Sequence, residues 1–214
     1  MRRILAGTLV CAAFVALVTG GCAKRTVHNE NRAVAVNVTP VVKETGATVR
    51  NAIMGAAASG PAATTITRQM DKQAQELAFE LPGAVVQRLG SGIVLTLTEG
   101  MLFAQDADEL TPASRDNLRR LATSFENYPN TRIMIVAHTD TQGGTDHNQN
   151  LSERRAQALA SFLEQLGVNR ARMTALGRGD AEPIATNDTD AGRQWNRRVE
   201  IAIYADEATR FGSR

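Results

Sequence analysis

The stretch Thr-Arg-Ile-Met-Ile-Val-Ala-His-Thr-Asp at residues 131–140 decides the fold class of this 214-residue chain. Its apolar run at 133–137 is too short for a helix and too continuous for a strand with one solvent-exposed face. We therefore expect a central strand of a sheet. The polar triplet His138-Thr139-Asp140 follows directly, at the point where this strand leads into a loop.

The segments around this strand alternate between strand and helix patterns. Strand composition recurs at residues 93–98, 173–176 and 199–204, and helical periodicity at 112–127 and about 148–166, with a short helix near 190–195. The order β-α-β-α-β-β predicts an α/β sandwich over residues 91–205, with helices packed on a mixed four-stranded sheet. Residues 206–214 are expected to form a tail.

The N-terminus has the three parts of a secretory signal. Two arginines at residues 2–3 precede an apolar stretch at 4–18, and small residues lead to Cys22. This arrangement resembles a bacterial lipoprotein signal, so residues 1–21 are predicted to be a signal peptide and Cys22 a lipidation site. The alternative is an ordinary signal peptide that leaves Cys22 as a free thiol or in an intermolecular disulfide.

Cysteine usage favours lipidation. The chain has only two cysteines, and Cys11 would be removed with the signal, which leaves Cys22 unpaired in an oxidising compartment. Acylation accounts for the odd cysteine and supplies a stable anchor when two or three chains are attached. By resemblance, Ala23 after the cysteine favours the outer membrane over the inner one.

Residues 22–90 are interpreted as a lipidated flexible tether. No helical or strand period persists over 23–62, whereas a short amphipathic helix is predicted near 67–81. A fully extended chain from Cys22 to residue 90 would reach on the order of 220 Å. The small-residue run at 54–61 could alternatively be a helix-packing or membrane-associating patch.

Charge and composition exclude two classes of function. The formal net charge is +2, but the part from residue 91 carries 14 arginines, no lysine and 17 acidic residues, a balance of −3. Such a domain lacks a broad basic face, so nucleic acid is not an expected partner. No run after the signal approaches the length of a membrane span, which excludes a polytopic membrane protein.

Arg155 is the most informative anomaly. It lies on the apolar stripe of the second helix, between Leu151 and Leu159, and therefore points inward. An unpaired buried guanidinium is very costly, so an anion belongs beside it. Asp140, at the end of the central strand, is the candidate. The two groups are either a structural ion pair or an acid and a base that face one zwitterionic ligand.

Several blocks then resemble the OmpA-like peptidoglycan-binding domain family over residues 91–205. They are His138-Thr139-Asp140, Leu151-Ser152 with Arg155-Ala156, and Asn196-Arg197-Arg198-Val199, in the family's order. The acid and the arginine are 15 positions apart, as in the family. Three departures are Ala137 in place of the usual glycine, Ala104 in place of a common aspartate, and Asp106 where some relatives have asparagine.

The resemblance implies a non-enzymatic, cofactor-free protein that binds peptidoglycan without a covalent bond. It implies that the diaminopimelate of the stem peptide is held by Asp140 and Arg155, with contributions from Asn148, Thr139, Leu151 and Arg198. The alternative for Arg197 or Arg198 is a purely structural pair. It also implies an outer-membrane lipoprotein whose domain faces the periplasm and tethers the membrane to the wall.

Two rival interpretations stay open. A zinc-dependent wall hydrolase would use His138, Asp140 and His147 as ligands, since imidazole and carboxylate suit zinc. A stator-like peptidoglycan binder would keep residues 4–18 as an uncleaved inner-membrane anchor.

Overall fold

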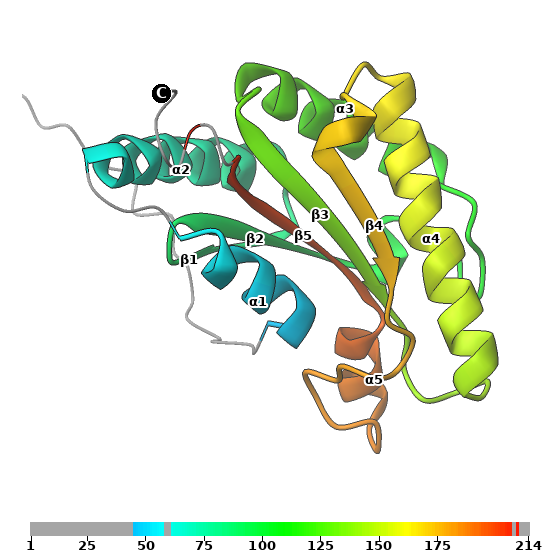
Figure 1. The fold of residues 1–214 in the computed structure, drawn as a ribbon. Helices are drawn as coiled ribbons and strands as arrows, with labels where there is room; N and C mark the ends of the chain where they lie inside the picture. The colour runs from blue at the N-terminus through cyan, green and yellow to red at the C-terminus, as the bar shows by residue number, and fades with distance from the viewer. Residues whose placement is uncertain (1–44, 58–60, 207–208, 210–214) are drawn as a thin grey trace, which may run out of the picture. The chain divides into compact units, whose positions relative to one another are not determined.

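The computed structural model describes residues 45–57, 61–206 and 209 (Figure 1). The helices in these ranges are α1 (Ala47–Gly55), α2 (Pro61–Glu80), α3 (Pro112–Asn127), α4 (Thr145–Gln165) and α5 (Asp190–Asn196). The strands are β1 (Val85–Leu89), β2 (Gly92–Thr98), β3 (Thr131–His138), β4 (Met173–Gly177) and β5 (Arg198–Ala205). Short 3-10 turns occupy Glu99–Met101 and Arg170–Arg172.

The strands form one mixed sheet in the order β1-β2-β5-β3-β4. The β3–β4 pair is parallel and the other pairs are antiparallel. The α/β class and the central position of β3 are as predicted, but the sheet has five strands rather than four. The additional strand, β1, pairs with β2 across a turn at Gly90, whose φ of +54° suits glycine. Its residues are all half-buried, so it gives no alternating pattern.

The main core fills one face of the sheet. Alternate residues of β3, Ile133, Ile135 and Ala137, point into it, and α2, α3 and α4 contribute the covering side chains. Helix α3 begins as the sequence predicts. The Thr111 side chain accepts a hydrogen bond from the Ser114 amide at 3.2 Å.

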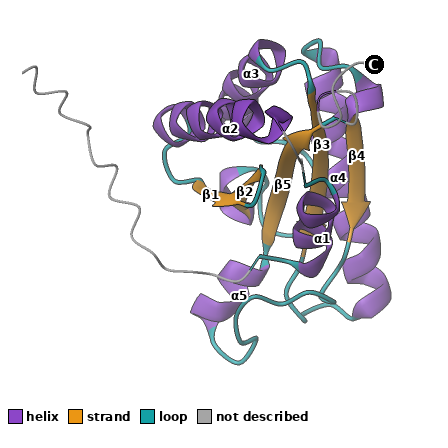
Figure 2. Ribbon diagram, turned by 60° about the vertical axis from the view of Figure 1, so that its left-hand side comes forward, coloured by secondary structure: helices purple, strands orange, loops and turns teal. Residues whose placement is uncertain are grey.

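Helix α1 covers the opposite face of the sheet. In Figure 2 it lies in front of β5 and β3, with α4 behind them. Val49 and Ile53 are buried against Val94, Val136 and Ala202 of the three central strands. Both faces of β3 are therefore buried, which explains its continuous apolar run.

The start of α1 is held by two acidic side chains. The Gly46 amide donates to both carboxylate oxygens of Glu200 at 3.1 Å. The Thr48 amide donates to Glu182 at 3.2 Å, and the Thr48 hydroxyl donates to the same carboxylate at 2.5 Å. Carboxylates at a helix N-terminus satisfy free amides and favour the helix dipole.

The flexible linker predicted up to residue 90 is therefore wrong for the described residues 45–57 and 61–90. Helix α2 contains the predicted helix at 67–81 but begins earlier, and its residues Met70 and Leu77 belong to the main core. The predicted boundary at residue 91 falls inside the β1–β2 turn. The folded unit instead includes the described residues 45–57 and 61–90.

Several predictions fall outside the described part of the chain. The signal peptide at 1–21 and Cys22 lie there, as does most of the predicted tail at 206–214. Within the described ranges, none of the helices has both the length and the apolar character needed to cross a membrane.

Candidate functional site

The candidate site lies at one end of the sheet. Thr98 of β2, Arg198 of β5 and His138 of β3 form a row there, since Arg198 is the register partner of both others. The chain continues from this row to Glu99, which follows β2, while Arg197 precedes β5. Because β2 and β3 both end at this end of the sheet, Glu99 and Asp140, which lie just beyond them, are brought into the same region.

A cavity of about 360 Å³ opens at this end. It is lined by Glu99, Gln105, Asp106, Thr139, Asp140, Gln142, Gly143, His147, Asn148, Leu151, Arg155, Asp190, Arg193 and Arg197. The lining comes from the ends of β2 and β3, the first turns of α4, and the region of α5. Most of these side chains are polar or charged, so the cavity suits a polar ligand.

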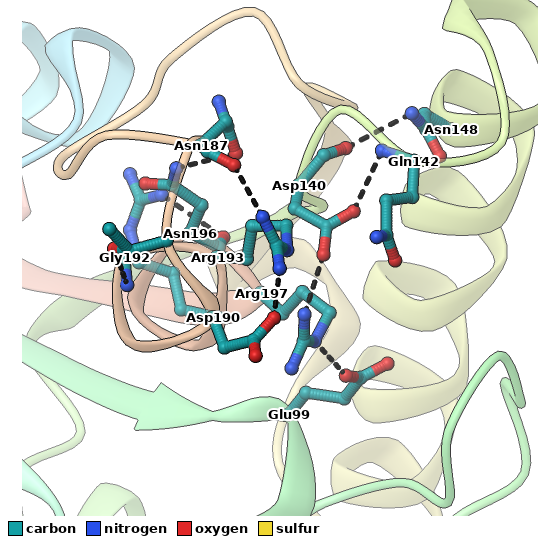
Figure 3. Close-up of polar contacts among 12 residues, drawn as sticks. Glu99, Asp140, Gln142, Asn148, Asn187, Asp190, Gly192, Arg193, Asn196 and Arg197 are labelled. Carbon is teal, nitrogen blue, oxygen red and sulfur yellow. Dashed lines mark hydrogen bonds and ion pairs between the residues drawn. The ribbon is translucent and has the colours of Figure 1, made fainter.

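The loop between β3 and α4 fixes Asp140. Its Oδ1 accepts from the Gln142 amide at 2.9 Å, and its carbonyl accepts from Asn148 Nδ2 at 3.0 Å (Figure 3). The loop then turns through Gly143 and Gly144, whose φ angles of +95° and +83° favour glycine. Asp140 and Asn148 are both almost fully buried, so the carboxylate is held in one orientation.

Four charged side chains form a continuous chain across the cavity, which we name the charge chain: Asp140, Arg197, Glu99 and Arg155. Arg197 Nη1 lies 2.5 Å from Asp140 Oδ2, and its Nε lies 2.7 Å from Glu99 Oε2 (Figure 3). The other oxygen of Glu99 pairs with Arg155 Nη2. Burial lowers the pKa of Arg197, but the carboxylates of Asp140 and Glu99 outweigh it and raise this pKa.

Arg155 points inward, as its place on the helix predicts. Its exposed fraction is 2%, its Nε donates to the Ala107 carbonyl at 2.8 Å, and its guanidinium carbon lies 5.2 Å from the centre of the Phe103 ring. Its anionic partner is Glu99, however. Of the two alternatives for Asp140 and Arg155, the direct structural ion pair is therefore wrong, because each group pairs with a different residue of the charge chain. Both nevertheless line the same cavity.

Comparison with known proteins identifies the family of this chain. A family model described as "OmpA family" matches residues 102–197. The outer-membrane lipoprotein YfiB of Pseudomonas aeruginosa is 32% identical over 146 residues, which cover 68% of this chain and 83% of YfiB. This chain belongs to the OmpA family.

Two further likenesses are informative. "Probable lipoprotein YiaD" of Escherichia coli is 37% identical over 136 residues, which cover 63% of this chain and 62% of YiaD. A solved structure titled as the cell wall anchor of the T6SS from Pseudomonas aeruginosa is 28% identical, with a TM-score of 0.55. That match covers 66% of this chain and 97% of the anchor.

Four of the residues that the OmpA-family resemblance implies line the cavity beside Arg155: Asp140, Asn148, Thr139 and Leu151. The Thr139 hydroxyl is buried and has no hydrogen-bond partner among the described residues. The departure at Ala137 does not reach the cavity, because its side chain points into the main core.

Arg198, in contrast, is not a cavity residue. It lies on the α1 side of the sheet, where its Nε is 3.2 Å from Glu200 Oε1 and its Nη2 donates to the Glu182 carbonyl at 3.1 Å. Arg197, its neighbour, lines the cavity instead. Successive residues at a strand start point to opposite faces, so the one-residue difference decides which arginine faces a ligand.

The zinc ligands of the hydrolase interpretation do not converge. His138 is buried on the α1 side, with Nε2 3.5 Å from Glu200 Oε2, whereas Asp140 and His147 line the cavity. In the described ranges, no group of three or more histidine, cysteine, aspartate or glutamate side chains is arranged to hold a metal ion. The OmpA family match also indicates no catalytic family.

Sequence reasoning missed Glu99 and Arg197. Glu99 is an acid that directly follows a predicted strand, the same signal that drew attention to Asp140, so the rule about strand ends could have found it. For Arg197 and Arg198, the sequence does not decide which one is a structural partner, because the starting residue of β5 is not evident from the pattern.

Proposed function

We propose that this protein binds peptidoglycan non-covalently through the diaminopimelate of the stem peptide. The observation that carries the proposal is that a buried carboxylate, Asp140, and a buried guanidinium, Arg155, line one polar cavity. The free end of diaminopimelate carries an ammonium and a carboxylate on one carbon. An acid and a base in one cavity match this pair of charges.

Asp140 is the proposed ammonium acceptor. A carboxylate offers about four lone-pair directions. The Gln142 amide and Arg197 use two of them, so the remaining directions are available to an ammonium donor. The loop hydrogen bonds hold the carboxylate in place before the ligand arrives, which lowers the entropic cost of binding.

Arg155 is the proposed carboxylate donor. Its guanidinium has five N–H groups, and its contacts within the described residues use one on Nε and one on Nη2. The remaining N–H groups are free to bind a carboxylate. The Phe103 ring lies against the guanidinium and limits its movement.

The rest of the lining fits the same ligand. Thr139 lines the cavity, and its buried hydroxyl has no partner among the described residues. Leu151 provides an apolar surface for the methylene chain. The likeness to a protein titled as a cell wall anchor agrees with a wall ligand.

The test is titration of the full chain, in detergent, with meso-diaminopimelate and with purified sacculi. Asp140→Asn and Arg155→Gln should each weaken binding by about tenfold or more, since each removes a charged hydrogen bond. The matched controls are Asp146→Asn and Arg154→Gln, which make the same changes at exposed positions of α4. Equal losses in the variants and controls, or a wild-type protein that does not bind, would refute the proposal.

The proposal includes an outer-membrane lipid anchor at Cys22. It is supported by the sequence features before Cys22 and by the names of YfiB and YiaD, both lipoproteins. Since the folded unit includes residue 45 onward, at most about 23 residues separate the anchor from it, and their extended reach is about 80 Å. This is much shorter than the 220 Å of a tether that continues to residue 90.

Intact mass of the protein from membranes distinguishes the possible anchors. A mature chain that begins at an acylated Cys22 agrees with the lipoprotein, and Cys22→Ser should abolish the acylated form. A mass that includes residues 1–21 would instead support the inner-membrane, stator-like alternative. An unmodified chain that begins at Cys22 would support an ordinary signal peptide.

A further inference from the structure

We propose that Glu99 sets the charge selectivity of the cavity, a proposal that rests on the ligand class inferred above. Glu99 is a positioning residue: it holds Arg155 with one carboxylate oxygen and Arg197 with the other. It thereby joins the guanidinium that faces the ligand carboxylate to the guanidinium that holds Asp140. Without Glu99, the acid and the base of the cavity would have no common support.

The geometry of Glu99 suits this role. Its side chain is only 10% exposed, and it lies in the 3-10 turn Glu99–Met101 directly after β2. The Glu99 amide also donates to the Arg197 carbonyl at 2.9 Å, so backbone and side chain together fix the distance between the two segments. Arg197 is more accessible, at 30% exposed, because it lies at the cavity surface.

The charges explain the selectivity. The charge chain contains two carboxylates and two guanidiniums, so its formal charge is zero. A ligand end with one ammonium and one carboxylate is also neutral and adds no net charge to a partly buried site. A ligand end with a single carboxylate or a single ammonium would leave an uncompensated charge, which is unfavourable where water is limited.

The test compares three probes of nearly equal length: meso-diaminopimelate, pimelate and cadaverine. Pimelate ends carry only a carboxylate, and cadaverine ends carry only an ammonium. Glu99→Gln leaves the charge chain with a net positive charge. It should therefore shift the pimelate-to-diaminopimelate affinity ratio about tenfold toward pimelate. Arg197→Gln leaves the charge chain with a net negative charge. It should shift the cadaverine-to-diaminopimelate affinity ratio about tenfold toward cadaverine.

The control is Glu109→Gln, which removes the same charge from a side chain that is 87% exposed and outside the cavity. It should leave every ratio unchanged, and each variant is checked for folding by thermal unfolding. If Glu99→Gln does not fold, the cadaverine ratio of Arg197→Gln decides alone, and an unchanged ratio overturns the proposal.

The failure of this inference is distinguishable from the failure of the proposed function. A wild-type protein that binds diaminopimelate, with variants that lose affinity for all three probes equally, would mean that Glu99 only supports the fold. That result would leave the diaminopimelate site intact. A wild-type protein that does not bind diaminopimelate would overturn both proposals.

Discussion

Replacing Ile53 with alanine tests whether helix α1 is part of the folded domain, contrary to the linker that the sequence predicts. Ile53 is 1% exposed and packs against the α1 side of the sheet with Val49. The contact is close. A β-carbon placed on Gly92 of β2 would lie 2.8 Å from Ile53 Cγ2, so strand and helix backbones have no spare space between them.

The expected loss of stability follows from this packing. The substitution removes three buried carbon atoms, and each is worth about 0.8 kcal/mol of transfer free energy, or about 2.4 kcal/mol together. A cavity term adds to this where the surroundings cannot collapse, and measured values for such changes are about 2–5 kcal/mol. We expect a decrease of about 3 kcal/mol in the free energy of unfolding, which lowers Tm by about 6–12 °C for a unit of this size.

The assay is equilibrium unfolding of the full chain in urea, with Met54→Ala as the matched control on the same helix. Met54 is 59% exposed, so its replacement should change stability by no more than about 0.5 kcal/mol. If Ile53→Ala were as mild as Met54→Ala, α1 would not be docked in solution. The reasoning from burial would then be refuted, and residues 45–57 would belong to the linker.

Three further predictions concern titration and packing. Burial lowers the pKa of His138. Burial alone would raise the pKa of Glu200, but its cationic and hydrogen-bonding neighbours outweigh burial and lower this pKa overall. Each depressed pKa contributes stability that is present above that group's unfolded pKa and is lost below it. Stability measured in urea should therefore fall below pH 6.5 through His138 and, additionally, below pH 4.5 through Glu200, by up to about 1.4 kcal/mol per pH unit for each group. His138→Asn should reduce that slope between pH 6.5 and 5. Burial and the hydrogen bond to Glu76 raise the pKa of Tyr128 to about 12, so its stabilisation is present below pH 10 and lost towards pH 12. Absorbance titration should show this late ionisation in the wild type and an earlier one in Glu76→Gln. Finally, Gly177→Ala should lower stability by about 1–3 kcal/mol in thermal unfolding, because the new β-carbon would meet a backbone nitrogen of α4 at 2.4 Å; an unchanged Tm would contradict this close packing.

The sequence by itself determined the central elements of this protein. The apolar run of β3 identified a central strand, and helical periodicity located α3 and α4, because each of these elements carries enough buried residues to leave a period. The same pattern showed that Arg155 points inward. The position of Asp140 after β3 indicated the end of the sheet at which the cavity lies.

Helix α1 and strand β1 depended on tertiary structure. Val49 and Ile53 are the main apolar contacts of a nine-residue helix, too few to give a clear period, and an isolated helix of that length is marginal in water. It forms because the sheet supplies an apolar face, and because Glu200 and Glu182 accept hydrogen bonds from the amides of Gly46 and Thr48 at its start. Strand β1 likewise depends on pairing with β2.

The partners of the charged residues were also decided only in three dimensions. Asp140 and Arg155 line the same cavity, but Glu99 and Arg197 stand between them. A one-residue shift of β5 would change which arginine faces the cavity. The acid that meets Arg155 depends in turn on where β2 ends beside β5. Local pattern gives the direction of a side chain along its own element, whereas the charge it meets is fixed by the register between elements distant in sequence.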